Sequence, residues 1–80
     1  MIDFYVVEKE ELQKKIGKRI IELRTLKGWS QSQLARACEK DRQAIEKLEN
    51  GKVNPTAFSL YEVSIALEVP LVALFDFEKE

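Results

Sequence analysis

Two helix starts that lie close together in the chain constrain its fold more than any other feature of the sequence. The first is Ser30 followed three residues later by Gln33, a capping box in which each side chain accepts a hydrogen bond from the other residue's backbone N–H. Trp29 before the cap and Leu34 after it form a hydrophobic staple. A short helix is therefore predicted over residues 31–38.

The second start is Asp41, a favourable N-cap residue, and the helix that it begins is predicted over residues 42–50, with Gly51 at its end. On a helical wheel, one arc carries Ala44, Ile45, Leu48 and Glu49. The opposite arc carries Arg42, Gln43, Glu46, Lys47 and Asn50. Only residues 39–41 separate the two helices, so the sequence predicts a tight turn between them.

A longer amphipathic helix is predicted before this pair, near residues 11–27. Apolar residues recur there at i, i+4, i+8 and i+11, the spacing of one helix face, at Leu12, Ile16, Ile20 and Leu23. Gly28 follows, and a glycine after a helix typically adopts a left-handed backbone conformation.

Two prolines mark the helices after the pair. Asn54 followed by Pro55 reads as an N-cap with proline at the first helical position, which predicts a helix near residues 56–67. Pro70 starts a last short helix near residues 71–75. Eighty residues fit one domain with a modest core, so we expect an all-α, compact five-helix domain over residues 16–75.

The two ends of the chain are less clearly patterned. Residues 2–7, IDFYVV, are apolar and rich in β-branched side chains, which fits either a strand or an arm laid on the body of the protein. We therefore treat residues 1–10 as an N-terminal arm. Phe75 and Phe77 precede an acidic tail and either close the core or belong to a self-association patch.

Several functional classes are disfavoured by composition. The chain has no histidine, which removes the usual general base and the usual metal ligand. Its one cysteine, Cys38, lies on an apolar helix face and is expected to be a structural, inert thiol. No glycine-rich phosphate loop is present. We expect neither an enzyme nor a bound metal or cofactor.

The absence of long apolar segments excludes a further class. No apolar run approaches the roughly 20 residues of a membrane span, and acidic residues stand where a signal peptide needs basic and apolar ones. A cytoplasmic protein without a membrane partner is expected.

Charge is distributed unevenly along the chain. The net charge is −1, but residues 14–52 sum to +6, whereas residues 1–13 sum to −3 and residues 53–80 to −4. A basic middle between acidic ends favours a phosphate-facing patch despite the acidic overall balance. The alternative is an ordinary solvated surface.

Two helices joined by a tight turn match a helix-turn-helix, and the wider pattern resembles the Xre/Cro-type, phage repressor-like family of DNA-binding domains. The resemblance covers roughly residues 16–75. It rests on Arg24, on the strings SQSQLA and IEKLENGK, on Asn54-Pro55, and on Ala66-Leu67 with the proline-started helix that follows. It implies the five-helix fold of that family.

The helix predicted over residues 42–50 has the dimensions and the two faces that DNA reading requires. A helix of about 10–12 Å diameter fits the major groove, which is about 12 Å wide. Arginine can bind guanine, and glutamine adenine, through two hydrogen bonds each. The predicted base-reading residues are Arg42, Gln43, Glu46 and Lys47. Glu46 accepts from a cytosine amine or repels phosphate, and the alternative for all four is a plain surface position.

Other residues are expected to hold the DNA backbone. The resemblance implies that Gln31 contacts phosphate, helped by the N-terminal amides of its helix. Asn50, Lys52 and Asn54 follow the reading helix and are expected to approach phosphates too. Ordinary surface positions are again the alternative.

Glu49 lies on the buried arc of its helix, where an unpaired carboxylate is costly, so it needs a cation. The resemblance implies an internal bridge between Arg24 and Glu49. The sequence also departs from the family, which usually has glycine in the turn where this chain has Glu39. A positive φ at that residue would cost of order 1 kcal/mol or more.

These features predict a sequence-specific DNA-binding transcriptional regulator, most simply a repressor that occupies a two-fold operator on double-stranded DNA as a homodimer. Residues 71–77, alone or together with the 2–7 arm, are the expected dimer surface. The compact length resembles controller proteins of restriction–modification systems and small antitoxin-type regulators. The alternative is therefore an antitoxin-type module that neutralises a toxin or other protein partner and binds DNA secondarily.

Overall fold

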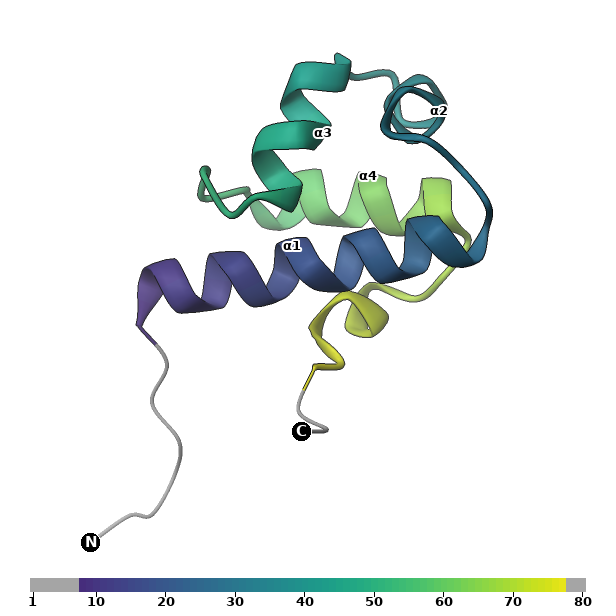
Figure 1. Ribbon diagram of the computed structural model, residues 1–80. Coiled ribbons are helices and arrows are strands. Elements are labelled where there is room, and N and C mark those ends of the chain that lie inside the picture. Colours follow the sequence, from purple (N-terminus) through teal and green to yellow (C-terminus); the bar gives the residue numbers. More distant parts are fainter. Residues whose placement is uncertain (1–7, 78–80) are drawn as a thin grey trace, which may run out of the picture.

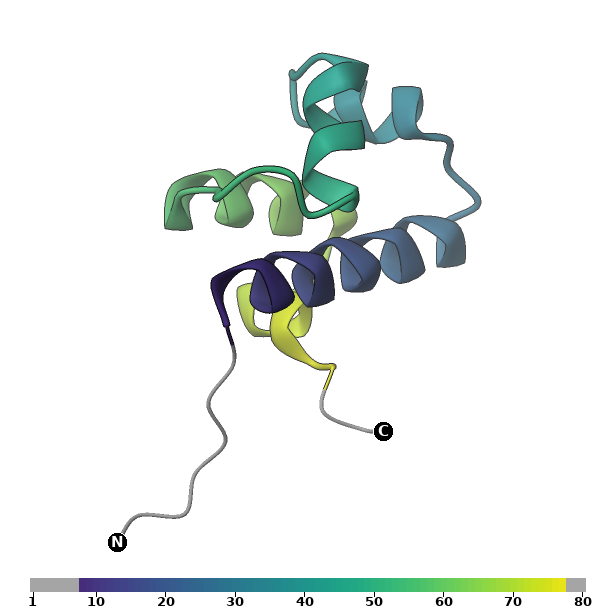
Figure 2. The same cartoon turned by 60° about the vertical axis from the view of Figure 1, so that its left-hand side comes forward.

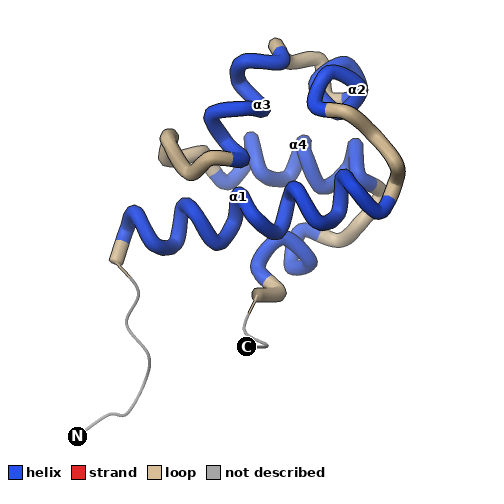
Figure 3. The backbone as a smooth tube through the Cα atoms, in the orientation of Figure 1, coloured by secondary structure: helices blue, strands red, loops and turns tan. Residues whose placement is uncertain are grey.

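The computed structural model describes residues 8–77, and all regular structure in that range is helical (Figure 1, Figure 3). The elements in chain order are α1 (Lys9–Leu26), α2 (Gln31–Ala37), α3 (Arg42–Glu49), α4 (Ala57–Leu67) and the 3₁₀ helix η1 (Leu71–Phe75). The predicted all-α fold is confirmed, although the last element is a 3₁₀ helix. The strand or arm expected in residues 2–7 lies outside the described residues, whereas residues 9 and 10 of the expected 1–10 arm belong to α1.

The longest helix, α1, runs across the molecule and separates two groups of elements. The pair α2 and α3 lies on one side of it, and η1 lies on the other (Figure 1, Figure 2). Contacts join α1 to both α3 and η1, and α4 to both α2 and η1. One face of α3 therefore packs on the body of the protein, while the opposite face is left outside.

Every helix contributes to one apolar core. Its buried members are Ile16, Ile20, Leu23, Leu34, Ala35, Ile45, Leu48, Leu60, Val63, Leu67 and Leu74. Burying a leucine or isoleucine side chain stabilises a fold by about 1.5–3 kcal/mol relative to exposure. Leu74 of η1 is fully buried, so the last element closes the core.

The predicted start of α2 is confirmed at the level of single hydrogen bonds. The Gln33 amide N–H donates to Ser30 Oγ at 3.1 Å, and the Ser30 N–H donates to Gln33 Oε1 at 2.7 Å. Trp29 lies against the core, and its N–H donates to the Arg24 carbonyl at 3.2 Å. Together these contacts satisfy amide groups that a helix start otherwise leaves without partners.

The turn between α2 and α3 requires a left-handed residue, as the sequence suggested. Glu39 has φ 56°, a conformation that costs a side-chain-bearing residue about 1–2 kcal/mol relative to glycine. Asp41 is the N-cap residue of α3, but its side chain makes no capping hydrogen bond. Gly28 has φ 73°, which confirms the predicted left-handed end of α1.

The start of α4 differs from the sequence prediction. Its N-cap is Thr56, whose hydroxyl accepts from the Ser59 N–H at 3.0 Å, so Asn54 and Pro55 belong to the preceding loop. The expected N-cap at Asn54 is wrong because a second good capping residue stands two positions later. The last helical residue is Leu67, and the C-cap residue Glu68 has φ 62°. A glycine is the usual residue in this left-handed conformation, so the sequence did not indicate this helix end.

α1 and α3 approach each other closely at Gly17 of α1. A Cβ atom at this position would lie 2.7 Å from the Leu48 carbonyl oxygen and the same distance from the Glu49 carbonyl carbon. Only glycine lets the C-terminal end of α3 sit this close to α1. No local pattern in the sequence marks Gly17 for this role.

Candidate nucleic-acid interface

The two faces of α3 are clearly divided. Ile45, Leu48 and Glu49 are buried, and the exposed side chains on the other side are Arg42, Gln43, Lys47 and Asn50. Glu46 is half-buried. Ala44 was placed on the buried arc by the helical wheel, but it is exposed at the edge of that arc.

The buried end of α3 is held by a charged network. Arg24 donates from Nε to Glu49 Oε2 at 2.6 Å and from Nη2 to Glu49 Oε1 at 3.0 Å. Its Nη1 donates to the Trp29 carbonyl at 2.9 Å. The Glu49 side chain is only 1% exposed, so these charge-assisted bonds replace its hydration. This arrangement contains the pair that the resemblance implied.

Gln31 extends the network to the start of α3. Its Nε2 donates to Glu49 Oε1 at 2.9 Å, and its Oε1 accepts from Arg42 Nη1 at 3.2 Å. An amide has one acceptor end and one donor end, so binding a carboxylate forces its oxygen to face Arg42. Gln31 therefore lies between a core anion, Glu49, and the exposed guanidinium of Arg42.

Three residues expected to touch DNA also contact one another. Asn50 Nδ2 donates to Glu46 Oε2 at 2.8 Å, and Lys52 Nζ lies 3.8 Å from the same oxygen. The Glu46 carboxylate thus neutralises part of the positive charge at the end of α3. The Lys52 side chain is still 61% exposed.

Asn54 lies at the edge of a shallow hollow of about 450 Å³ between α3 and the start of α4. Gln43 and Lys47 line the same hollow, together with Thr56 and Ser59. The structure therefore brings Asn54 to the side of the molecule that carries two of the predicted base-reading residues.

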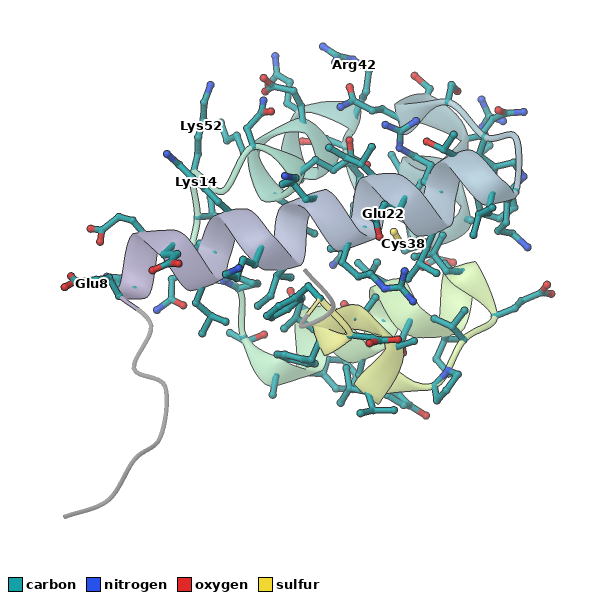
Figure 4. The ribbon with its side chains drawn as sticks, turned by 60° about the horizontal axis from the view of Figure 1, so that its bottom comes forward. Glu8, Lys14, Glu22, Cys38, Arg42 and Lys52 are labelled. Atoms are coloured by element: carbon teal, nitrogen blue, oxygen red, sulfur yellow. The ribbon has the colours of Figure 1, made fainter. Side chains whose placement is uncertain are left out.

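Lys14 of α1 also lies at this surface, although no local pattern in the sequence marks it for that role. A Cβ at Gly51, which has φ 70°, would lie 2.6 Å from the Lys14 Cγ, so α1 passes directly under the loop that follows α3. Lys14, Lys52 and Arg42 project toward the same side of the molecule, whereas Glu8 and Glu22 do not (Figure 4). The only indication in the sequence of this close approach is Gly51, which stands just after the C-cap of α3.

Cys38 and Trp29 do not form part of this surface chemistry. The Cys38 Sγ donates to the Leu34 carbonyl at 3.1 Å, and burial raises the pKa of the thiol, which lowers its reactivity. Trp29 packs against the core, and Lys27 Nζ lies 4.6 Å from the centre of its ring. Both residues therefore have structural explanations.

Within residues 8–77, no helix combines the length and apolar character needed to cross a bilayer.

Comparison with known proteins places this arrangement among helix-turn-helix proteins. Residues 20–74 match a protein-family model described as helix-turn-helix. The uncharacterized HTH-type transcriptional regulator y4dJ of Sinorhizobium fredii is 34% identical over 64 residues, which are 80% of this chain and 83% of that protein.

Two solved structures of controller proteins have a similar fold. The restriction-modification controller protein C.AhdI from Aeromonas hydrophila is 35% identical and superposes with a TM-score of 0.77, covering 79% of this chain and 96% of that one. The wild-type restriction-modification controller protein C.Esp1396I is 33% identical with a TM-score of 0.75, covering 82% of this chain and 85% of that one.

Proposed function

Because this chain belongs to the helix-turn-helix family of transcriptional regulators, we propose that it is a cytoplasmic, DNA-binding repressor that occupies a two-fold operator as a homodimer. The chain is a DNA-binding transcriptional regulator, and its family acts by binding rather than by catalysis. The operator symmetry, the sign of regulation and the dimer are the parts that are proposed.

One observation carries the proposal: α3 buries Ile45, Leu48 and Glu49 and presents long polar side chains on the other side. A helix of this kind fits the major groove, which is about 12 Å wide. Arg42 has donors suited to guanine, and Gln43 has the donor and acceptor suited to adenine. Together with Glu46 and Lys47 they are the proposed base-reading set.

The proposed backbone contacts surround this helix. Lys52 and Lys14 project toward the side that Arg42 faces (Figure 4). Asn50 and Asn54, which follow α3 in the chain, are exposed. The backbone N–H groups of Gln31 and Ser32, which the capping box does not use, would donate to phosphate beside the Gln31 side chain. These contacts would fix the register of α3 without reading sequence.

The proposed dimer surface is an apolar hollow of about 260 Å³ beside η1. Leu12, Leu60, Leu71 and Phe75 are among the residues that line it. Val72, which follows Leu71 in the chain, is 71% exposed, whereas Leu74 is fully buried in the core. Of the segment 71–77 predicted from sequence, Val72 and Phe75 are therefore the exposed large apolar side chains that a second copy would cover.

Selection of bound sites from random DNA tests this function. We expect enrichment of a two-fold symmetric sequence whose half-sites are separated by about one helical turn, roughly 34–36 Å. Enrichment of an unrepeated site would contradict the dimer and leave DNA reading intact. No enrichment at all would contradict sequence-specific binding.

An antitoxin-type protein-interaction module, which neutralises a toxin and binds DNA secondarily, is the second candidate. One observation favours it: α4 carries exposed aromatic and aliphatic side chains that belong to neither surface described so far. Purification of the chain from its host would distinguish the two, because an antitoxin is recovered with a stoichiometric partner in the absence of DNA.

A further inference from the structure

The outer face of α4 carries three exposed apolar side chains. Phe58, Tyr61 and Ile65 stand at i, i+3 and i+7 on this helix and are 66%, 47% and 57% exposed. The Phe58 and Tyr61 rings lie 6.1 Å apart, centre to centre. Exposed large apolar residues are unremarkable singly, but a contiguous stripe is a sign of an interaction surface.

The stripe borders a hollow formed with the C-terminal end of α2. Phe58, Tyr61 and Ile65 line this hollow of about 390 Å³ together with Ala37, Cys38, Glu39 and Glu62. It shares no residue with the hollow beside η1 that is proposed for the dimer. The two surfaces can therefore be occupied independently.

The charged groups at this hollow are acidic. Glu62 is paired with Lys40 at 2.9 Å, but the Glu39 carboxylate has no hydrogen bond or ion pair within residues 8–77. Glu39 also occupies a left-handed position where glycine would be less strained. A carboxylate without a partner is thus held at the rim of an apolar surface.

We propose that this face docks one amphipathic, basic helix of a partner protein. The apolar side of that helix would lie along Phe58, Tyr61 and Ile65 and insert a side chain into the hollow. A lysine or arginine flanking the apolar side would pair with Glu39. This is the helix-in-groove mode of recognition, in which apolar anchors at helical spacing give affinity and rim charges select the partner.

A second copy of this chain fits the face less well. A symmetric contact would set the hollow against itself, and among the described residues that line it there are two carboxylates and no cation. Lys40, which follows Glu39 in the chain, is already paired with Glu62. Self-association would therefore bring two unpaired Glu39 carboxylates together, whereas a basic partner neutralises each one.

Two synthetic peptides test the charge preference. One is a leucine–lysine helix about four turns long, and the other has the same leucine pattern with glutamate in place of lysine. In fluorescence anisotropy titrations, we expect the basic peptide to bind at least tenfold more tightly. Amide chemical shifts in the full-length protein should change mainly at residues 37–39 and 58–65. Equal binding of both peptides, or shifts confined to other surfaces, would overturn the proposal.

Matched variants separate docking from general charge and from folding. Glu39→Gly and Glu68→Gly each remove one exposed carboxylate from a left-handed position, so both relieve the same backbone strain. Only Glu39→Gly is expected to weaken binding of the basic peptide, by about three- to tenfold. Ile65→Ser should weaken it by about tenfold or more, as loss of an apolar anchor does. Equal losses for Glu39→Gly and Glu68→Gly would mean that the peptide responds only to net charge.

The same amides report on the competing occupant. If a second copy covers this face, the shifts at residues 58–65 will depend on protein concentration before any peptide is added, and the partner-helix proposal fails. DNA binding enters none of these measurements, so their failure would leave the proposed repressor function standing.

Discussion

The carboxylate of Glu49 receives two hydrogen bonds from the guanidinium of Arg24, at 2.6 and 3.0 Å, and so ties the end of α3 to α1. Gln31 donates a third bond to the same carboxylate at 2.9 Å. A bidentate arginine fixes direction as well as distance. The angle at which α3 leaves the body of the protein is thus set by a buried charge pair in addition to apolar packing.

Replacing Glu49 with alanine should remove much of the stability of the fold. Loss of one partner from a buried pair costs about 3–5 kcal/mol, because the remaining charge is left without compensation. A chain of 80 residues has a free energy of unfolding of about 4–12 kcal/mol. Denaturant melts should show this loss, whereas Glu22→Ala, at an exposed pair, should change stability by about 1 kcal/mol or less.

Replacing Gly17 with alanine should also destabilise the protein. In a free helix this change stabilises by about 0.5–1 kcal/mol, but here the new Cβ would meet backbone atoms of Leu48 and Glu49 that cannot move aside singly. Overpacking of this kind costs about 1–3 kcal/mol. Thermal and urea melts would check the sign. A more stable variant would show that α1 and α3 are farther apart than described.

Substitution by glycine should instead stabilise the protein at Glu39 and Glu68, the two glutamates with a left-handed backbone conformation. Glu39→Gly and Glu68→Gly should each raise the free energy of unfolding, by about 0.5–1 kcal/mol, since the strain relieved exceeds the entropy that glycine loses. The gain should be smaller for Glu68, which also loses its ion pair with Lys27. The double variant should show the sum of both effects. Melts in which neither variant gains stability would contradict the strain at these turns.

Local signals account for the parts of the fold that were predicted correctly. The capping box at Ser30 and Gln33 uses neighbours in sequence, so it can be read without tertiary information. The start of α4 was misplaced because Asn54 and Thr56 are both good caps, and only the packing of the helix selects Thr56. The end of α4 at Glu68 carries no glycine, so its left-handed conformation could not be recognised.

In the candidate site, too, some features could be predicted from the sequence and others depend on tertiary packing. The exposed side of α3 follows from helical periodicity, and the arginine–glutamate pair followed from a family resemblance. The roles of Gly17 and Lys14 could not be read because they depend on α1 passing beneath the end of α3. The contact of Glu46 with Lys52 depends on the path of the loop after α3.

The network through Gln31 predicts a particular DNA-binding defect. If Gln31 holds the Arg42 guanidinium in place, Gln31→Ala should relax base preference at the position that Arg42 reads. A residue that only binds phosphate would instead weaken all sequences alike. Titration against the preferred site and against single-base variants of it would distinguish these outcomes. The fold should survive, since Arg24 still pairs with Glu49.

Gln43→Ala and Lys52→Ala should fail in different ways. Gln43 is proposed to read a base, so its loss should cost about 1–3 kcal/mol on the preferred site and relax preference at one position in each half-site. Lys52 is proposed to bind phosphate, so its loss should weaken good and poor sites alike and reduce the salt slope by about one per subunit. Part of that effect is offset because Lys52 lies near the Glu46 carboxylate in the free protein.

Titrations against a preferred site, a mutated site and unrelated DNA at two salt concentrations measure both the base preference and the salt slope. Equal weakening of all three by Gln43→Ala would mean that α3 does not read bases through this residue, and a wild-type protein without preference would leave docking of a protein partner as the better account of the chain.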